Sequence, residues 1–169
     1  GLYRFDGVAF RRWDILSRPA LAQNPVSRVR VFEDGTVWML LGNGEPNPGT
    51  DDPNVKIAGR LARFRHGEVT IFDAASGMPR ANANALVEGP HGQPWVATSA
   101  GVVAFDGARF TPAVALGAVA SRSFRALARD DRGGVWLGGQ SGVVRFAGGA
   151  TVVLMELPVT SLRARPAAV

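Results

Sequence analysis

The chain has 169 residues, 46% of them apolar, and a formal net charge of +5, so it is long enough for one domain with a sizeable core. The absence of cysteine excludes disulfide bonds and thiolate metal sites, and the absence of an 18-residue apolar run predicts no membrane insertion by this segment. The arginines are scattered singly and Lys56 is the only lysine, which favours no nucleic-acid partner.

The first residues predict two short strands joined by a tight turn. Leu2–Phe5 is an apolar-rich run, Asp6-Gly7 is a turn pair, and Phe10 marks the strand that returns. An Asp-Gly pair supplies the positive φ that a tight hairpin needs. Later copies of this pattern show that residues 1–13 correspond to the third and fourth strands of a repeat.

Residues 26–72 predict a complete four-stranded unit. The apolar run 29–32 turns at Asp34-Gly35 into a strand that opens on Trp38, and two further strands follow residue 59. A polar insert, residues 43–58, separates the second strand from the third. These runs are short and rich in turn residues, and no helical periodicity is sustained in them.

The same unit returns in residues 83–110 and 124–154. Trp95 and Trp136 lie 41 residues apart, and removing the 16-residue insert gives the same interval between Trp38 and Trp95. Four antiparallel strands repeated at this period are typical of a β-propeller blade. We expect the three tryptophans at equivalent, mostly buried positions, as wedges between neighbouring sheets.

The last residues, 158–169, predict only a first strand. Combined with residues 1–13 they make a blade that lacks its tryptophan strand, which leaves unpaired sheet edges. We therefore expect the remaining blades of a longer parent chain, or a second copy of this chain, to complete the propeller.

The sequence thus predicts an all-β fold. We expect a partial β-propeller, with about three complete four-stranded blades plus one split or incomplete blade, forming one domain over residues 1–169. The predicted blade pieces are residues 1–13, 26–72 with the insert 43–58, 83–110, 124–154 and 158–169.

Residue types used in catalysis and metal binding fall at turns of this repeat. Zinc needs three or four converging ligands, whereas the only histidines, His66 and His91, belong to separate hairpin turns. Four aspartates also recur at turns, which favours turn formers over an acid–base pair; they are Asp6, Asp34, Asp106 and Asp131. We expect no catalytic residue, no metal site and no cofactor.

Two departures from the repeat predict a ligand site. The insert lies at a connection that commonly carries binding in propellers, although a neutral insertion explains it equally well. At one equivalent position in the first strands, every copy of the repeat has a polar residue. We expect this polar column at the mouth of the central channel; the alternative is that it is an ordinary solvated lining of the channel. Its Arg125 offers a bidentate fork to a carboxylate. The candidate residues are Ser27, Asn84, Arg125, Thr160, Asn43, Glu45, Asp51 and Asp52.

The pattern Asp-x-x-Gly-x-x-Trp, followed by Gly-Val-x-x-Phe-Asp-Gly-x-x-Phe, resembles the two-component regulator propeller repeat. The resemblance covers nearly the whole chain and is strongest over residues 83–110 and 124–146, while the insert 43–58 and Pro94 depart from it. It implies a non-enzymatic sensor module, periplasmic or otherwise extracytoplasmic, of a bacterial hybrid histidine kinase or diguanylate cyclase.

The resemblance leaves three classes of function to compare. Ligand sensing, with a small carbohydrate or carboxylated ligand, is the leading interpretation. A protein-interaction scaffold without a small ligand is the alternative. A propeller lyase is least favoured, because it needs a His and Glu constellation that two turn histidines do not supply.

Overall fold

The computed structural model describes residues 2–13, 26–42, 59–140 and 142–156. These residues form three four-stranded antiparallel sheets and one two-stranded sheet. The two-stranded sheet consists of β1 (Leu2–Phe5) and β2 (Phe10–Trp13). In every sheet the strands follow one another in chain order, so each four-stranded sheet is a meander of the kind that the repeat predicts.

The four-stranded sheets match the three predicted units. The first contains β3 (Val26–Val31), β4 (Val37–Leu41), β5 (Arg60–Arg65) and β6 (Glu68–Phe72). The second contains β7 (Ala83–Glu88), β8 (Pro94–Thr98), β9 (Gly101–Phe105) and β10 (Phe110–Pro112). The third contains β11 (Phe124–Arg129), β12 (Val135–Gly139), β13 (Gly142–Ala147) and β14 (Ala150–Glu156).

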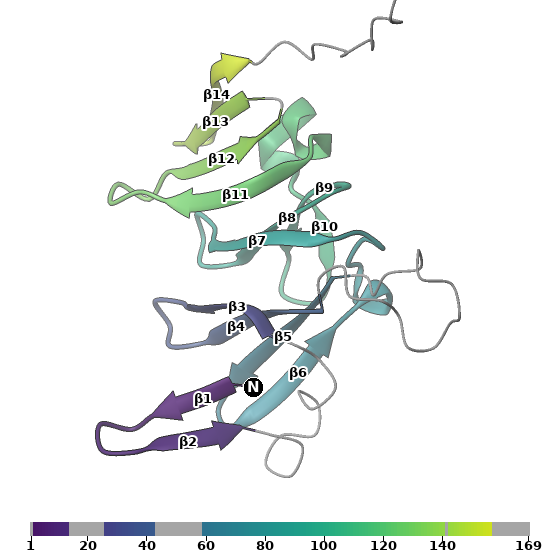
Figure 1. The fold of residues 1–169 in the computed structure, drawn as a ribbon. Coiled ribbons are helices and arrows are strands. Elements are labelled where there is room, and N and C mark those ends of the chain that lie inside the picture. Colours follow the sequence, from purple (N-terminus) through teal and green to yellow (C-terminus); the bar gives the residue numbers. More distant parts are fainter. Residues whose placement is uncertain (1, 14–25, 43–58, 141, 157–169) are drawn as a thin grey trace, which may run out of the picture.

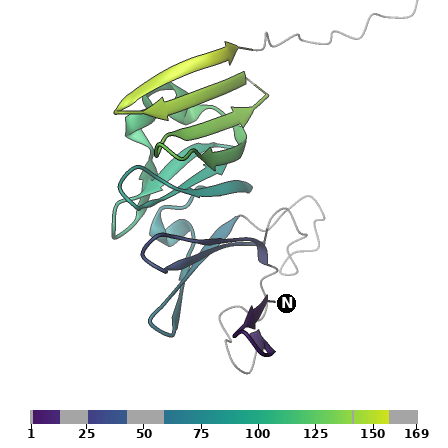
Figure 2. The same ribbon diagram turned by 90° about the vertical axis from the view of Figure 1, so that its left-hand side faces the viewer.

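The sheets follow one another in a stack, with their faces toward each other (Figure 1). The first strands adjoin, since β3 contacts β7 and β7 contacts β11. Figure 2 shows the same stack from the side that carries the β3–β4, β7–β8 and β11–β12 turns. This arrangement is all-β and propeller-like, as the sequence predicts. The insert 43–58 and the strand predicted within residues 158–169 lie outside the described residues.

Two short 3-10 helices occupy the connections between the four-stranded sheets. They are η2 (Ala74–Ser76) and η3 (Val114–Ser121), and η3 buries Leu116 and Val119 in the core between the second and third sheets. Neither helix is predicted from the sequence, because η2 has three residues and η3 is interrupted at Gly117, so neither shows a sustained periodicity.

The core lies between neighbouring sheets. Trp38 of β4 contacts Phe105 of the second sheet at 5.7 Å between ring centroids, and Trp95 of β8 contacts Phe146 of the third sheet at 5.2 Å. Both tryptophans are almost fully buried, with 3% and 1% of their surface exposed. The prediction that these side chains are wedges between sheets is confirmed for these two.

The prediction of mostly buried tryptophans is wrong for Trp136. It occupies the equivalent place on β12, but 37% of its surface is exposed. Trp38 and Trp95 are covered by the sheet that follows their own, whereas no further sheet follows the third one within the described residues. The indole of Trp136 instead donates to Asp130 Oδ2 at 2.9 Å and lies against the Arg145 guanidinium.

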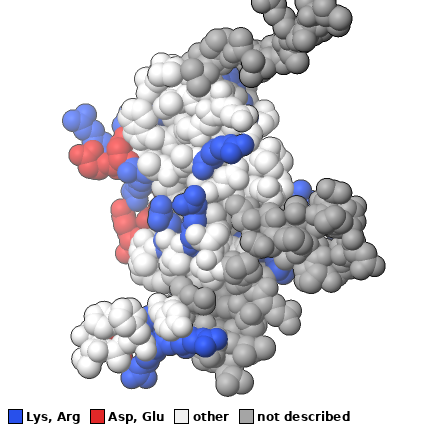
Figure 3. Space-filling view, viewed as in Figure 1, with Lys and Arg blue, Asp and Glu red and all other residues white. Residues whose placement is uncertain are grey.

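Charged side chains join the three sheets where the first strands end at the turns. Arg129 Nη1 lies 2.9 Å from Glu33 Oε1 and 3.5 Å from Glu88 Oε2, while the Glu33 amide donates to Glu88 Oε2. In Figure 3, acidic side chains gather on the side of the β3–β4 and β11–β12 turns. The Glu33 side chain is 76% exposed, so its pair with Arg129 contributes about 0–1 kcal/mol, whereas the Arg129 and Glu88 side chains are largely buried.

Candidate functional site

The polar column of the first strands is a column of β-bulges. The pairing between first and second strand shifts at the same place in all three sheets, and the extra residue is Ser27 in β3, Asn84 in β7 and Arg125 in β11. A bulge places one unpaired residue in a strand and bends it. The sequence therefore identifies a real structural column, whose polarity accompanies a backbone irregularity.

Two of the three bulge residues form hydrogen bonds within the protein. Asn84 Nδ2 donates to the Phe124 carbonyl at 3.0 Å, and the Asn84 carbonyl accepts from Arg28 Nε at 3.0 Å. Asn84 thus connects all three sheets. Ser27 Oγ donates to the Leu40 carbonyl at 3.3 Å. These contacts give both side chains a structural role.

Arg125 is exposed at the third bulge. The structure gives its side chain no hydrogen bond or ion pair with a described residue, so its guanidinium faces solvent. Ser27, Asn84 and Arg125 occur at the end of the sheets where Leu41 pairs with Arg60, the strand ends that the insert connects. Thr160, Asn43, Glu45, Asp51 and Asp52 lie outside the described residues, and the predicted site at this end stays a prediction.

A pocket of about 450 Å³ opens at the opposite end, between the first and second sheets. It lies among the β3–β4 turn, strand β5, the β7–β8 turn and the end of β9. The rings of Trp38 and Phe105 form its apolar wall. The polar side chains that line it belong to Asp34, Thr36, Arg63, Arg65, His91, Gln93 and Asp106. This volume is in the usual range for small-molecule sites. The sequence analysis assigns these turns a purely structural role and misses the pocket.

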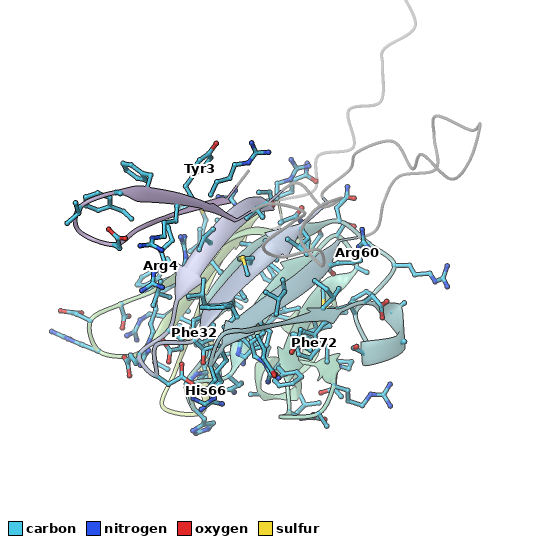
Figure 4. The ribbon with its side chains drawn as sticks, turned by 90° about the horizontal axis from the view of Figure 1, so that it is seen from below. Tyr3, Arg4, Phe32, Arg60, His66 and Phe72 are labelled. Atoms are coloured by element: carbon cyan, nitrogen blue, oxygen red, sulfur yellow. The ribbon has the colours of Figure 1, made fainter. Side chains whose placement is uncertain are left out.

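Arg63 is held in the pocket wall by aromatic rings. It pairs with Trp38 across β4 and β5, and its guanidinium carbon lies 5.9 Å from the Trp38 ring centroid and 5.4 Å from that of Phe72. In Figure 4, Phe72 and Phe32 both lie on the first sheet, and His66 marks its β5–β6 turn. Stacking on rings contacts the flat faces of a guanidinium and leaves its N–H edges for other partners.

The two carboxylates of the pocket are committed to their own turns. Asp34 accepts from the Thr36 amide and hydroxyl at 2.8 Å each, and Asp106 accepts from the amides of Ala108 and Arg109. These hydrogen bonds to the charged form lower the pKa of both carboxyls, so both are ionised at neutral pH. The prediction that these aspartates are turn formers is confirmed.

Arg65 lies at the rim of the pocket. Its Nη2 is 3.9 Å from Asp34 Oδ2, and both side chains are about half exposed, which makes this a weak pair. His91 and Gln93 belong to the β7–β8 turn, where the His91 amide donates to Gln93 Oε1 at 2.9 Å. This hydrogen bond uses the amide oxygen of Gln93, and the residue also lines the pocket. Within the described residues, no three histidine or acidic side chains converge as a metal site would require.

Helices that could cross a membrane are absent from the described part of the chain.

No family model and no curated protein matches this chain. Among solved structures, it is similar to the extracellular domain of the one-component system BT4673 from B. thetaiotaomicron, with a TM-score of 0.59 and 14% identity over 92% of the chain. It is also similar to the extracellular domain of the hybrid two-component system BT3049 from the same organism, with a TM-score of 0.52 and 15% identity over 81%. The chain spans 20% and 16% of the length of these two proteins. The likeness shows a shared fold.

Proposed function

We propose that this chain belongs to an extracytoplasmic propeller sensor of a bacterial signal-transduction protein, which binds a small ligand and passes the event to a signalling partner. The observation that carries the proposal is the fold shared, over 92% of the chain, with the extracellular domain of a one-component system. The repeat pattern supports the same class independently, because it resembles the two-component regulator propeller repeat.

The pocket between the first and second sheets is the proposed ligand site. A ligand there touches the β3–β4 turn and β5 on one sheet and the β7–β8 turn on the other. A ligand that contacts two sheets favours the sheet arrangement it fits best, which is the physical requirement for a sensor. The channel end with Ser27, Asn84 and Arg125, together with the insert, is the second proposed site.

The chemistry of the pocket supports binding rather than catalysis. Asp34 and Asp106 are both ionised and are held by their own turns, so neither carboxyl is placed to donate a proton at neutral pH. The pocket does not support a propeller lyase, because His91 is the only histidine in its lining.

A scaffold function without a small ligand is the competing proposal, and one observation favours it. The β1–β2 hairpin exposes apolar side chains, with Tyr3, Phe5, Val8 and Phe10 all more than half exposed. Exposed apolar patches of this kind mark protein contacts.

The two proposals are separated by a binding screen combined with a cell assay. The protein is tested by calorimetry against neutral and acidic sugars, and bacteria with the natural gene carry a reporter of its signalling output. The sensor proposal expects one compound that both binds the protein and changes the reporter. A protein that is found only in the cytoplasm on fractionation, or whose reporter ignores every compound it binds, contradicts the sensor proposal.

A further inference from the structure

In the third sheet, the arginine that lies opposite the repeat's tryptophan has a carboxylate as its hydrogen-bond partner. Arg145 pairs with Trp136 across β12 and β13, and Asp130 Oδ2 accepts from Arg145 Nη2 at 2.6 Å and from Arg145 Nε at 2.9 Å. The Trp136 indole donates to the same oxygen. The guanidinium therefore lies beside an aromatic ring and has a carboxylate partner at its edge.

The first sheet repeats the arginine and the tryptophan but not the carboxylate. Arg63 pairs with Trp38 in the same register. The turn before Trp38 has the same two backbone hydrogen bonds as the turn before Trp136, and they place Phe32 where the third sheet has Asp130. Phe32 is buried against Trp38 and has no acceptor in its side chain. Arg63 therefore lacks the carboxylate partner that Arg145 has in the third sheet.

No other described residue replaces that partner. The contacts of the Arg63 guanidinium are with the rings of Trp38 and Phe72, and no ion pair joins it to Asp34 or Asp106. Both aspartates lie in the same pocket but accept hydrogen bonds from their own turns. A guanidinium stays charged and keeps five N–H donors in a fork that fits a carboxylate. Arg63 is half-buried in the pocket wall, so its fork is open to a partner that binds in the pocket.

We infer that the pocket binds a small hydroxylated carboxylic acid, whose carboxylate pairs with Arg63 and takes the place that the Asp130 side chain has in the third sheet. The inference deepens the proposed sensor function and rests on it. The hydroxyl groups of the ligand donate to Asp34 and Asp106, whose remaining acceptor sites face the same pocket as Arg63.

The charges of the pocket select a carboxylate over a phosphate. Asp34 and Asp106 place two negative charges beside the two guanidinium groups of Arg63 and Arg65. These four charges already cancel, so every negative charge of a ligand meets repulsion from Asp34 and Asp106: a monocarboxylate brings one such charge to the Arg63 fork, whereas a phosphate dianion brings two. A neutral sugar leaves the Arg63 fork without an anion. The pocket volume of about 450 Å³ accommodates a sugar acid of one or two rings.

Calorimetry on the full protein tests the inference with matched probes. D-glucuronate is compared with D-glucose, which has a neutral hydroxymethyl group in place of the carboxylate, and with inorganic phosphate. We expect glucuronate to bind at least about tenfold more tightly than either, as a charge-assisted bidentate pair provides. Equal affinity for glucuronate and glucose, or no binding of glucuronate, galacturonate and gluconate at millimolar concentration, overturns the inference.

Substitutions at matched positions locate the carboxylate. Arg63→Gln should weaken glucuronate binding about 10- to 100-fold while leaving glucose unchanged, and Arg63→Lys should give an intermediate loss because it keeps the charge without the fork. Arg132→Gln, at an exposed arginine of the β11–β12 turn outside the pocket, should bind as the natural protein does. If Arg63→Gln fails to fold, Arg63→Lys carries the test. A folded Arg63 variant with natural affinity overturns the inference, and so does loss of binding in Arg132→Gln.

The cell reporter separates this inference from the sensor function on which it rests. If the reporter responds to a neutral compound that binds the protein, the sensor function stands and the carboxylate inference is overturned. If glucuronate binds through Arg63 but no compound that binds changes the reporter, the carboxylate site stands and the sensor function fails.

Discussion

Trp95 and Phe146 belong to different sheets, yet their ring centroids lie 5.2 Å apart in the core between the second and third sheets. Trp95 is 1% exposed, whereas Trp136, its equivalent in the third sheet, is 37% exposed. The same repeat residue is therefore a wedge between sheets in one copy and a surface residue in another.

The difference predicts unequal losses of stability. Trp95→Ala should lower the free energy of unfolding by about 3–5 kcal/mol, because it empties a packed position. Trp136→Ala should lower it by less than about 2 kcal/mol, because part of the indole already contacts water and little cavity results. Urea denaturation of both variants measures this, and equal losses would show that Trp136 is covered as well as Trp95.

The second prediction concerns how the stability that Asp130 contributes depends on pH. The hydrogen bond from Arg145, followed by that from Trp136, lowers the pKa of Asp130 to about 2, below its ordinary value of 3.8. A carboxyl with a lowered pKa in the folded state stabilises the protein above its unfolded pKa, and this stability is lost as the pH falls through the folded pKa. The natural protein should therefore lose its advantage over Asp130→Asn between about pH 4 and pH 2.

Melting temperatures of the natural protein and Asp130→Asn, taken from pH 6 to pH 2, check this window. The gap between the two should be constant above about pH 5 and should close toward pH 2. A gap that stays constant down to pH 2 would mean that Asp130 does not form its ion pair in solution.

Asn84 provides a prediction about how the sheets are connected. Asn84→Ala removes the hydrogen bond to the Phe124 carbonyl and should cost about 0.5–1.5 kcal/mol. Arg125→Ala changes the equivalent bulge, where the side chain is exposed, and should stay within about 0.5 kcal/mol of the natural protein. Chemical denaturation of the two variants compares the bulges directly, and a larger loss at Arg125 would contradict these assignments.

Alanine substitutions at two glycines with positive φ should differ in how much stability they cost. Gly35 and Gly77 have φ of 79° and 84°, so alanine is strained at both. A Cβ at Gly35 meets nothing within 4 Å, while a Cβ at Gly77 collides with the Phe110 carbonyl oxygen. Gly35→Ala should cost about 1 kcal/mol and Gly77→Ala at least twice as much, measured by thermal unfolding. Equal costs would show that backbone strain alone decides both.

The strands and their grouping were predictable because the turn glycines and the tryptophans repeat at a fixed interval. The bulges at Ser27, Asn84 and Arg125 were not, since the polarity of a column does not reveal that the pairing shifts there. The exposure of Trp136 was missed for a different reason. The burial of the repeat's tryptophan depends on the next sheet in the stack, and that sheet is not part of the repeat unit that contains the tryptophan.

The pocket could have been found from sequence by comparing copies at one more position. The residue that closes the first-strand turn is Phe32 in the first unit, Gly89 in the second and Asp130 in the third. Arg63 and Arg145 both lie opposite tryptophans. Only Arg145 has a carboxylate at the equivalent turn position, and this difference between copies can be seen in the sequence. The register that places these side chains together became visible only with the structure.

The proposed carboxylate site is tested most directly by a nuclear magnetic resonance titration of the protein with D-glucuronate, because it reports where a ligand binds as well as whether it binds. Binding at Arg63 should give the largest shifts at the Arg63 Nε–H and at the backbone amides of residues 34–36 and 91–93, with little change near residue 125. Shifts centred on residues 27, 84 and 125, with the Arg63 signal unmoved, would contradict it.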